Sequence, residues 1–475
     1  MLLSQLPIEI LKEIFSHFNS RDERAYALCA LALTCRRVSD VAFDLLYADI
    51  KLVIYGEKDF KRITLLNRSC RENRSLVDRI LCACIRLFFG DAAGACNEFL
   101  SHLAGSTSLT KLISDFSGKW KALPALYHYR EGSFSRVRNL TIWLQNVGGK
   151  EGYLPAEEVT RLCELPSLEI FTTHAPIAGF GTMSRPTAML VNLKHLNFCA
   201  SHPLSISLLE SLFPRTPNLK CLQLNVPGAA TQQHRMMSDS TSMQGCDLDE
   251  PLRPAFYGEL LAPVASSLRD LGIDTAIVKF PSHDGSKIDL SRFTNLIALG
   301  LGAPLLFGTG KTTASCGWSL DIWKCLPPRV ERLYLPLDDD QGLFWSSGDM
   351  RMHARSRTFG ELWQQRLVTD HVDWLIGLLD RKRENDASLK TITIAEEPII
   401  DRDQNWKIVQ WHMTEHLKAA ARAAGVELVI KIRVPRMFES PEFEVCEETW
   451  LWGAAGTISY EEEGDDEDLE QEIEE

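Results

Sequence analysis

Residues 219–224 read Leu-Lys-Cys-Leu-Gln-Leu, and the spacing of these three leucines decides the fold. The same Leu-x-x-Leu-x-Leu phrase, with other apolar residues allowed at the leucine positions, starts at Val137, Leu193, Leu268, Leu296, Val330 and Leu389. Weaker copies start at Leu109 and Leu168. The apolar alternation that ends each phrase predicts a short strand.

The intervals between phrases indicate a repeat. From residue 109 onward the starts lie 28, 31, 25, 26, 49, 28, 34 and 59 residues apart, and the two long intervals are each about two periods. Leucine-rich repeats have periods of about 20–29 residues. A helical stretch precedes some phrases, as at residues 204–213. One strand and one helix cannot bury their apolar faces alone, whereas stacked copies can.

We therefore predict an α/β fold in which residues 109–434 form an irregular leucine-rich-repeat-like solenoid with parallel strands on its concave side. Residues 426–434, Val-Glu-Leu-Val-Ile-Lys-Ile-Arg-Val, would be the last strand, after a helical stretch at 406–424. The alternative is a generic α/β domain with leucine-rich strands.

Composition and charge exclude several classes of protein. Hydrophobic residues are 45% and charged residues 24%, as in ordinary globular chains. The net charge is -13, but residues 461–475 hold eleven acids and no base, so the remainder is near -2. Without a basic excess we expect no direct contact with nucleic acid.

The compartment is predicted from what the sequence lacks. No window approaches 18 uncharged apolar residues, and the first residues have no basic start of a signal peptide. The thirteen cysteines include no Cys-x-x-Cys pair, which favours free thiols in a reducing compartment. We expect no membrane span and a cytoplasmic or nuclear location.

The N-terminal 50 residues predict a separate helical module. Apolar residues recur at helical spacing from Leu6 to Phe18, and further helices are predicted at residues 26–37 and 39–47. Three short helices cannot bury all of these side chains among themselves. The surplus apolar surface predicts a partner or a docked neighbouring domain. The alternative is a helical cap on the rest of the chain.

The residues of this module resemble the F-box. Residues 6–15, Leu-Pro-Ile-Glu-Ile-Leu-Lys-Glu-Ile-Phe, resemble its opening helix, and residues 31–38 resemble its second half. Residues 42–47 look like the segment that follows in F-box proteins of filamentous fungi. The resemblance implies docking onto the Skp-type adaptor of a cullin–RING ubiquitin ligase. Many members have tryptophan where this chain has Val38.

By motif position, the resemblance implies that eight residues face the adaptor: Leu6, Pro7, Ile10, Ile14, Phe15, Leu31, Cys35 and Val38. We divide the chain into an F-box at 1–50, a helical linker and repeat N-cap at 51–108, and the repeat domain at 109–434. Insertions near 227–254 and 341–358 interrupt the repeats. Residues 435–475 are a C-terminal extension with an acidic, disordered tail.

Three motifs suggest chemistry, and none is complete. Residues 308–313, Gly-Thr-Gly-Lys-Thr-Thr, resemble the end of a phosphate loop, but Leu305 stands where the first glycine belongs. His412-Met-Thr-Glu415-His416 has the inverted zincin spacing without a further identifiable ligand. Asp338–Asp340 lacks the rest of a calcium loop. We predict no catalytic residue, metal or cofactor, and a hydrolase or nucleotide-using enzyme is the alternative.

Residues between the buried leucines are predicted to point to the concave face. They are Thr141, Trp143, His195, Asn197, Gln223, Asn225, Asp270, Asp274, Arg332, Tyr334, Thr391 and Thr393. This mixture of polar and aromatic residues suits protein recognition, although solvated strand faces would look the same. The residues assigned to target binding are Trp143, Asn197, Gln223, Asp274, Arg332 and Tyr334.

The predicted function is a non-catalytic substrate-recognition subunit of an SCF-type ubiquitin ligase. The F-box would bind the adaptor, and the repeats would hold a protein target, whose identity the sequence does not give, near the transferred ubiquitin. An F-box scaffold without ubiquitin transfer is the closest alternative.

Overall fold

The computed structural model describes residues 7–16, 21–34, 36–88, 92–117, 126, 132–145, 154–175, 177–178, 188–199, 206–225, 253–274, 284–307, 322–337, 373–385, 388–396, 406–435 and 443–445. The predicted insertion near 341–358 and the acidic tail lie outside these residues, as does most of the insertion near 227–254.

The fold is built on one sheet of 14 strands. The strands are β1 (Asp49–Ile54), β2 (Cys82–Leu87), β3 (Lys111–Ser117), β4 (Asn139–Gln145), β6 (Ile170–Thr173), β8 (His195–Phe198), β9 (Cys221–Asn225), β10 (Asp270–Asp274), β11 (Ala298–Leu301), β12 (Arg332–Leu337), β13 (Thr391–Glu396), β14 (Trp406–Trp411), β15 (Glu427–Pro435) and β16 (Phe443–Val445). From β1 to β13 their order in the sheet is their order in the chain, and β15, β14 and β16 follow. A separate two-stranded sheet pairs β5 (Leu154–Pro155) with β7 (Ile177–Ala178).

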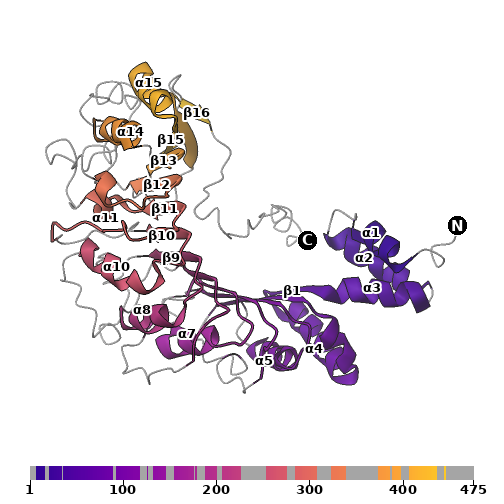
Figure 1. Ribbon diagram of the computed structural model, residues 1–475. Helices are drawn as coiled ribbons and strands as arrows, with labels where there is room; N and C mark the ends of the chain where they lie inside the picture. Colours follow the sequence, from indigo (N-terminus) through magenta and orange to yellow (C-terminus); the bar gives the residue numbers. More distant parts are fainter. Residues whose placement is uncertain are drawn as a thin grey trace.

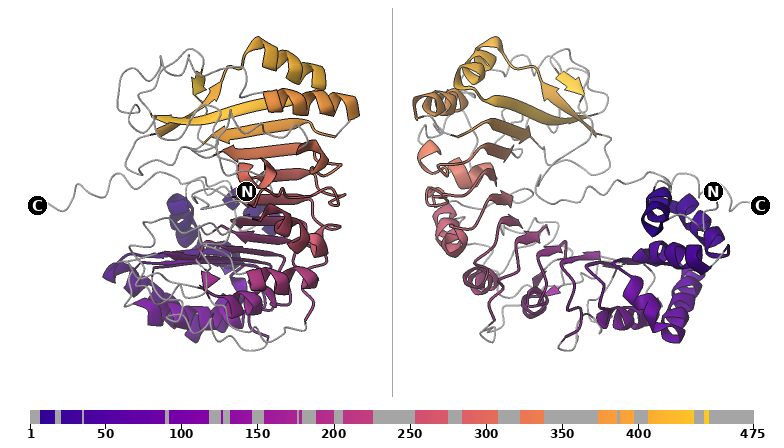
Figure 2. Two further views of the ribbon diagram at one scale, coloured as in Figure 1. Left: turned by 90° about the vertical axis from the view of Figure 1, so that its left-hand side faces the viewer. Right: turned by 45° about the vertical axis from the view of Figure 1, so that its right-hand side comes forward.

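Helices cover the outer, convex side of this curved sheet (Figure 1; Figure 2). They are α4 (Glu57–Glu72), η2 (Arg74–Arg79), α5 (Ala93–Ala104), α7 (Ala156–Cys163), α8 (Ile206–Leu212), η5 (Phe213–Arg215), α10 (Pro254–Leu260), η6 (Ala262–Val264), α11 (Ala303–Phe307), η8 (Ile322–Lys324), α14 (Asp373–Asn385) and α15 (Glu415–Ala424). Three further helices, α1 (Ile8–Ser16), α2 (Arg21–Ala32) and α3 (Arg36–Ala48), form the N-terminal module.

The Leu-x-x-Leu-x-Leu phrases form the strands as predicted, and each apolar position aligns with the same position in the next copy. Leu222 of β9 pairs with Leu196 of β8 and with Leu271 of β10, and all three are at most 2% exposed. Leu224 aligns with Phe198 and Ile273 in the same way. Because every copy contributes to the same apolar rows, the buried residues from Ile50 to Ile432 form one continuous core.

A regular backbone link joins neighbouring copies where each strand starts. The carbonyl of Lys194 accepts from the N–H groups of Lys220 and Cys221 at 2.7 and 3.0 Å. The carbonyl of Lys220 accepts in turn from Arg269 and Asp270 at 2.8 and 3.0 Å. These bonds satisfy polar groups that would otherwise be buried unpaired between copies.

Asparagine side chains add a second link that the sequence analysis did not predict. Nδ2 of Asn192, Asn218 and Asn295 donates to a carbonyl of the preceding copy, at Pro166, Val191 and Ser266 respectively. The three distances are 2.7, 2.8 and 2.6 Å. Each asparagine stands directly before the first leucine of its phrase, so the structural repeat is Asn-Leu-x-x-Leu-x-Leu in these copies.

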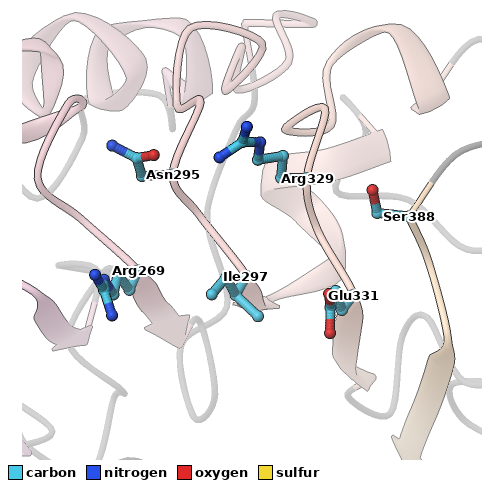
Figure 3. Close-up of a pocket in the computed structure, with 6 residues that line it drawn as sticks. All are labelled: Arg269, Asn295, Ile297, Arg329, Glu331 and Ser388. Atoms are coloured by element: carbon cyan, nitrogen blue, oxygen red, sulfur yellow. The ribbon is translucent and has the colours of Figure 1, made fainter.

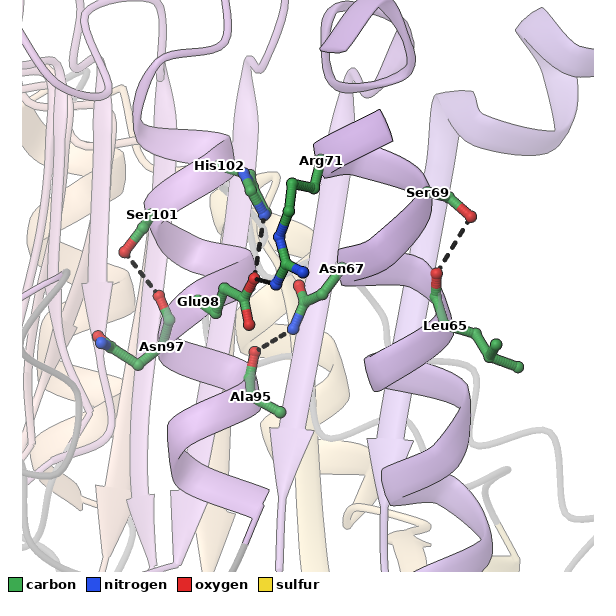
Figure 4. Close-up of polar contacts among 9 residues, drawn as sticks. All are labelled: Leu65, Asn67, Ser69, Arg71, Ala95, Asn97, Glu98, Ser101 and His102. Carbon is green, nitrogen blue, oxygen red and sulfur yellow. Dashed lines mark hydrogen bonds and ion pairs between the residues drawn. The ribbon is translucent and has the colours of Figure 1, made fainter. Parts of the chain in front are cut away.

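Polar side chains join the first two helices of the convex layer, as Figure 4 shows. Asn67 of α4 is 2% exposed, and its Nδ2 donates to the carbonyl of Ala95 in α5 at 2.8 Å. Arg71 forms an ion pair with Glu98, whose carboxylate also lies 3.7 Å from Nε2 of His102. These contacts pack α4 against α5 in the segment between the module and the first phrase, which also contains β2.

The ends of the sheet differ from the prediction in three respects. The sheet starts at β1 and not at residue 109, so the segment predicted as a helical linker also contributes β1 and β2. Residues 406–411 are strand β14, and only Glu415–Ala424 of the predicted helix 406–424 is helical. The strand β15 is not the last, because β14 and β16 extend the sheet beyond it in antiparallel pairing.

The cysteines of the described residues are free thiols. Burial raises the pKa of Cys96 and Cys163 to about 12, so these side chains stay protonated and behave as small apolar groups.

Candidate functional site

The N-terminal module has a core of its own. Among its described side chains, five are buried in this core: Leu11, Leu28, Val38, Val41 and Ala42, each 3% exposed or less. Leu31, Ala32, Leu45 and Leu46 pack around them. The helices differ from the predicted ranges mainly in α2, which spans Arg21–Ala32 where residues 26–37 were predicted, while α3 starts at Arg36, three residues before its predicted start.

The outer side of α1 leaves apolar side chains in solvent. Ile10 is 47% exposed and Ile14 is 39% exposed, and Pro7 is exposed one turn before them. Residues 7, 10 and 14 share one face of a helix because their spacing is three and four. Leu33, just after α2, is 88% exposed. We name Pro7, Ile10 and Ile14 the α1 face.

The predicted adaptor residues divide into three groups. Pro7, Ile10 and Ile14 lie on the surface, as an adaptor contact requires. Leu31 is half-buried against the module's core, and Val38 is 1% exposed within it. The assignment of Val38 to the adaptor surface therefore disagrees with its position, since it holds the three helices together. Leu6, Cys35 and the side chain of Phe15 lie outside the described residues.

The module joins the sheet without a connecting loop. Helix α3 ends at Ala48, and β1 starts at Asp49. Nη1 of Arg79 lies 2.7 Å from Oδ1 of Asp44 and donates to the carbonyl of Asp40 at 3.2 Å. Tyr47 packs against the core of the body. These contacts couple the direction of α3 to the first strand of the sheet (Figure 1).

The predicted target-binding residues lie on the strand face opposite the leucines. The pairing register places Thr141, Thr172, Asn197, Gln223, Gly272, Gly300, Tyr334 and Thr393 in one row across the sheet. Arg332 and Trp143 belong to the rows on either side. Asp274 pairs with Asn225 at the end of β10, but its side chain lies outside the described residues. The register thus brings this predicted set onto one face.

Part of this concave face is shielded from solvent. Asn197 is 4% exposed, its Nδ2 donates to Oγ1 of Thr172 at 3.3 Å, and its Oδ1 has no hydrogen-bond partner among the residues that the structure describes. Trp143 stacks on His174 with ring centroids 3.4 Å apart and planes at 12°. Burial lowers the pKa of His174 to about 4, so its ring is neutral near pH 7.

Other positions on the concave face are charged and more open. Nη2 of Arg332 lies 3.4 Å from Oδ1 of Asp270, across the small residue Ala298 of β11. Burial raises the pKa of Asp270, and the guanidinium of Arg332 opposes that shift. This arrangement offers hydrogen bonds and an ion pair to a partner.

The residues of the candidate metal motif, His412 to His416, do not all lie on one helix. His412 precedes α15, while Glu415 and His416 begin it, and both histidines are exposed. Nζ of Lys418 already lies 3.0 Å from Oε1 of Glu415. Within the described ranges, no group of three or more His, Cys, Asp or Glu is placed to hold a metal. Residues 308–313 and 338–340, the other two motifs, lie outside those ranges.

The same part of the chain contains no helix long and apolar enough to span a bilayer.

Residues 3–52 match the model of the F-box-like family. No curated protein matches the chain. A crystal structure of a protein from Bacteroides fragilis, a Northeast Structural Genomics Consortium target, is 14% identical in sequence. The match covers 90% of this chain and 86% of that one with a TM-score of 0.29, a value too low to support an argument about fold or function.

Proposed function

We propose that this chain, which carries an F-box-like domain at residues 3–52, is a non-catalytic substrate-recognition subunit of an SCF-type ubiquitin ligase. In this proposal the module binds a Skp-type adaptor, and the sheet binds a protein target. F-box domains generally bind adaptors of that type. We interpret the stacked strand-and-helix units as an irregular leucine-rich-repeat-like solenoid.

The observation that carries the proposal is the α1 face. Ile10 and Ile14 are 47% and 39% exposed, although the described part of the module buries five residues in its core. A module of this size gains little stability from its own burial, so covering these side chains with a partner is favourable. They lie within the segment that matches the F-box-like family.

The junction between the module and the sheet supports a role in positioning. Since α3 continues into β1 and Arg79 binds both Asp40 and Asp44, a target on the sheet would be held in a defined place relative to the adaptor. Holding two reactants together replaces a bimolecular encounter with an intramolecular one. Ubiquitin transfer itself would be carried out by the partners, in the cytoplasm or nucleus.

The proposed target surface is the concave face around Gln223, Arg332 and Tyr334. Gln223 and Tyr334 belong to one row of the sheet and Arg332 to the next, and together they combine an amide, an aromatic ring and a guanidinium. Arginine and tyrosine are enriched at the centres of protein interfaces. Trp143 and Asn197 belong to the more closed end of the same face.

The test is adaptor binding by a full-length variant with Ile10→Asp and Ile14→Asp. Two carboxylates in a buried contact would be strongly unfavourable, so the affinity for a purified Skp-type adaptor should fall by at least about 100-fold. The matched control changes two exposed leucines of the body, Leu65→Asp and Leu81→Asp, which are 62% and 49% exposed. Circular dichroism would check that both proteins are folded. Equal adaptor binding by both would refute the proposal.

Co-purification distinguishes a ligase subunit from a scaffold. Wild-type chain with adaptor should also recover a cullin and support ubiquitin transfer to a co-purified protein. Recovery of the adaptor without any cullin would favour the scaffold alternative.

A further inference from the structure

The starts of the strands form a strongly basic edge. At the strands of the large sheet from β4 to β13, seven exposed or half-exposed bases stand within four residues before a strand: Arg136, Arg138, Lys194, Lys220, Arg269, Arg329 and Lys390. Five of them occupy the position directly after the first leucine, or its equivalent, of a phrase. We name these seven residues the basic edge. Because the parallel strands start side by side, the bases line one margin of the sheet.

The acids on this margin are already paired. Glu169 lies 2.6 Å from Nζ of Lys194 and 3.9 Å from Nη1 of Arg138. Glu331 lies 2.8 Å from Nζ of Lys390. Lys220, Arg269 and Arg329 make no ion pair with any residue that the structure describes. The margin therefore has a net positive charge of five, although the chain without residues 461–475 is near -2.

A cavity of about 450 Å³ lies between two of these unpaired bases. It is lined by Arg269, Asn295, Ile297, Arg329, Glu331 and Ser388, at the starts of β10 to β13 (Figure 3). Guanidinium groups pair with carboxylates through two parallel hydrogen bonds. The amide of Asn295 is partly used, since Nδ2 donates to the carbonyl of Ser266. The chemistry of this lining suits a carboxylate side chain.

We propose that the basic edge is a docking surface for the acidic segment of this chain, residues 461–475, which holds eleven acids and no base. The opposite charges are concentrated in two separate parts of a body that is otherwise close to neutral. This inference does not depend on the proposed ligase function, because it involves neither the adaptor nor the concave face.

The segment can reach the edge. The last described strand, β16, ends at Val445, so fifteen residues separate it from Glu461. Extended chain spans about 3.3 Å per residue, which gives roughly 50 Å. From β16 to β10 there are six strand steps, or about 29 Å at about 4.8 Å each. The register places Val445 level with Glu396 at the end of β13, so the segment also has to pass back along about five residues, roughly 17 Å, to reach the strand starts. The combined distance of about 34 Å is still shorter than the extended chain. A tethered segment within reach has an effective concentration on the order of millimolar.

The consequence is competition. Any acidic partner of the basic edge has to displace the chain's own acidic segment, so affinity for such a partner should rise when that segment is neutralised. The attraction should also weaken as salt rises, since exposed charges are screened over about 10 Å at 0.1 M ionic strength.

The test uses a fluorescent peptide of residues 457–475 and full-length proteins. In one protein the eleven acids of 461–475 are changed to their amides. The peptide should bind this neutral-tail chain at least about ten-fold more tightly than it binds the wild-type chain, whose edge is occupied. Adding Arg269→Glu and Arg329→Glu to the neutral-tail chain should weaken binding by about ten-fold or more. The matched control adds Lys58→Glu and Lys61→Glu, two exposed lysines of α4, and should bind normally.

Three results would overturn the proposal. Equal peptide binding by the wild-type and neutral-tail chains would show that the segment does not occupy the edge. An equal loss of peptide binding in the control with Lys58→Glu and Lys61→Glu would show that the peptide is attracted by the net charge of the chain and not by the basic edge. Dimerisation of the wild-type chain that disappears in the neutral-tail chain would assign the segment to a second copy.

Discussion

The N-terminal module and the body bury their apolar residues to very different extents. Among its described residues, the module buries five in its core and leaves Ile10, Ile14 and Leu33 in solvent. In the body, one core runs from Ile50 to Ile432 and is covered by helices on the convex side. The two regions nevertheless meet without a loop, where α3 continues into β1.

The two regions differ in what covers their apolar side chains. The apolar face of each copy in the body is covered by its neighbours. The concave face and the strand starts can therefore carry different polar residues from copy to copy. Within the described residues no further copy packs beyond α1, and exposed apolar side chains of this kind suit the adaptor contact proposed above. We therefore expect core mutations in the two regions to affect the stability of the protein in different ways.

The largest effect is expected from the centre of the body. Phe171 of β6 is fully buried and packs edge-on against Phe198, with ring centroids 6.4 Å apart. Phe171→Ala should lower the free energy of unfolding by about 3–5 kcal/mol, because it leaves a cavity that neighbouring copies cannot fill. Urea denaturation measures this, with Leu65→Ala as the exposed control. A loss below about 1 kcal/mol would contradict a tightly packed continuous core.

A core change in the module should remain local. Leu11 is fully buried among five core residues, and Leu11→Ala should cost about 2–4 kcal/mol. We expect residues 8–48 to lose hydrogen-exchange protection while the urea transition of the body stays in place. An equal shift of the body's transition would show that the two regions unfold as one unit.

A pH effect tests the closed end of the concave face. The pKa of His174 is held at about 4 by burial, whereas the unfolded chain takes up this proton below about pH 6.5. Stability is therefore lost as pH falls from 6.5 towards 4, by roughly 2 kcal/mol between pH 7 and 4.5. His174→Phe keeps an aromatic ring against Trp143. It should remove the contribution of this residue to the change of unfolding free energy with pH. An unchanged slope would show that the imidazole is solvated.

The smallest effect concerns the asparagine links. Asn218→Ala removes the 2.8 Å bond to the carbonyl of Val191 and should cost about 1 kcal/mol in urea denaturation. The control is Glu210→Ala, an exposed residue of α8. No difference between the two variants would show that the link adds nothing to the stacking of apolar side chains.

The sequence predicted the parts of the fold that depend on apolar spacing. The phrases at Leu193, Leu219 and Leu268 became neighbouring strands in register, because identical spacing places identical rows together. Residues 82–87, Cys-Ala-Cys-Ile-Arg-Leu, were missed because Ala83 stands at the position where the other phrases have their second large apolar residue. Residues 406–411 were taken as helical, although adjacent Ile408 and Val409 are β-branched and suit a strand.

The sites were predicted only in part, for a similar reason. Pairing register follows from the repeat, so the row that contains Asn197, Gln223 and Tyr334 could be foreseen. Whether a side chain is covered depends on contacts distant in sequence, which is why the burial of Val38 and Asn197 was not anticipated. The basic edge was visible as Lys or Arg after the first leucine, but its meaning needed the side-by-side strand starts.

Hydrogen exchange of the full-length chain, with and without a purified Skp-type adaptor, tests the central claim most directly. It reports on the module and the body in the same experiment. The account predicts that the adaptor slows exchange within residues 7–48, most strongly in α1, and leaves β4 to β13 unchanged. Protection confined to the body, or no protection anywhere at saturating adaptor, would contradict it.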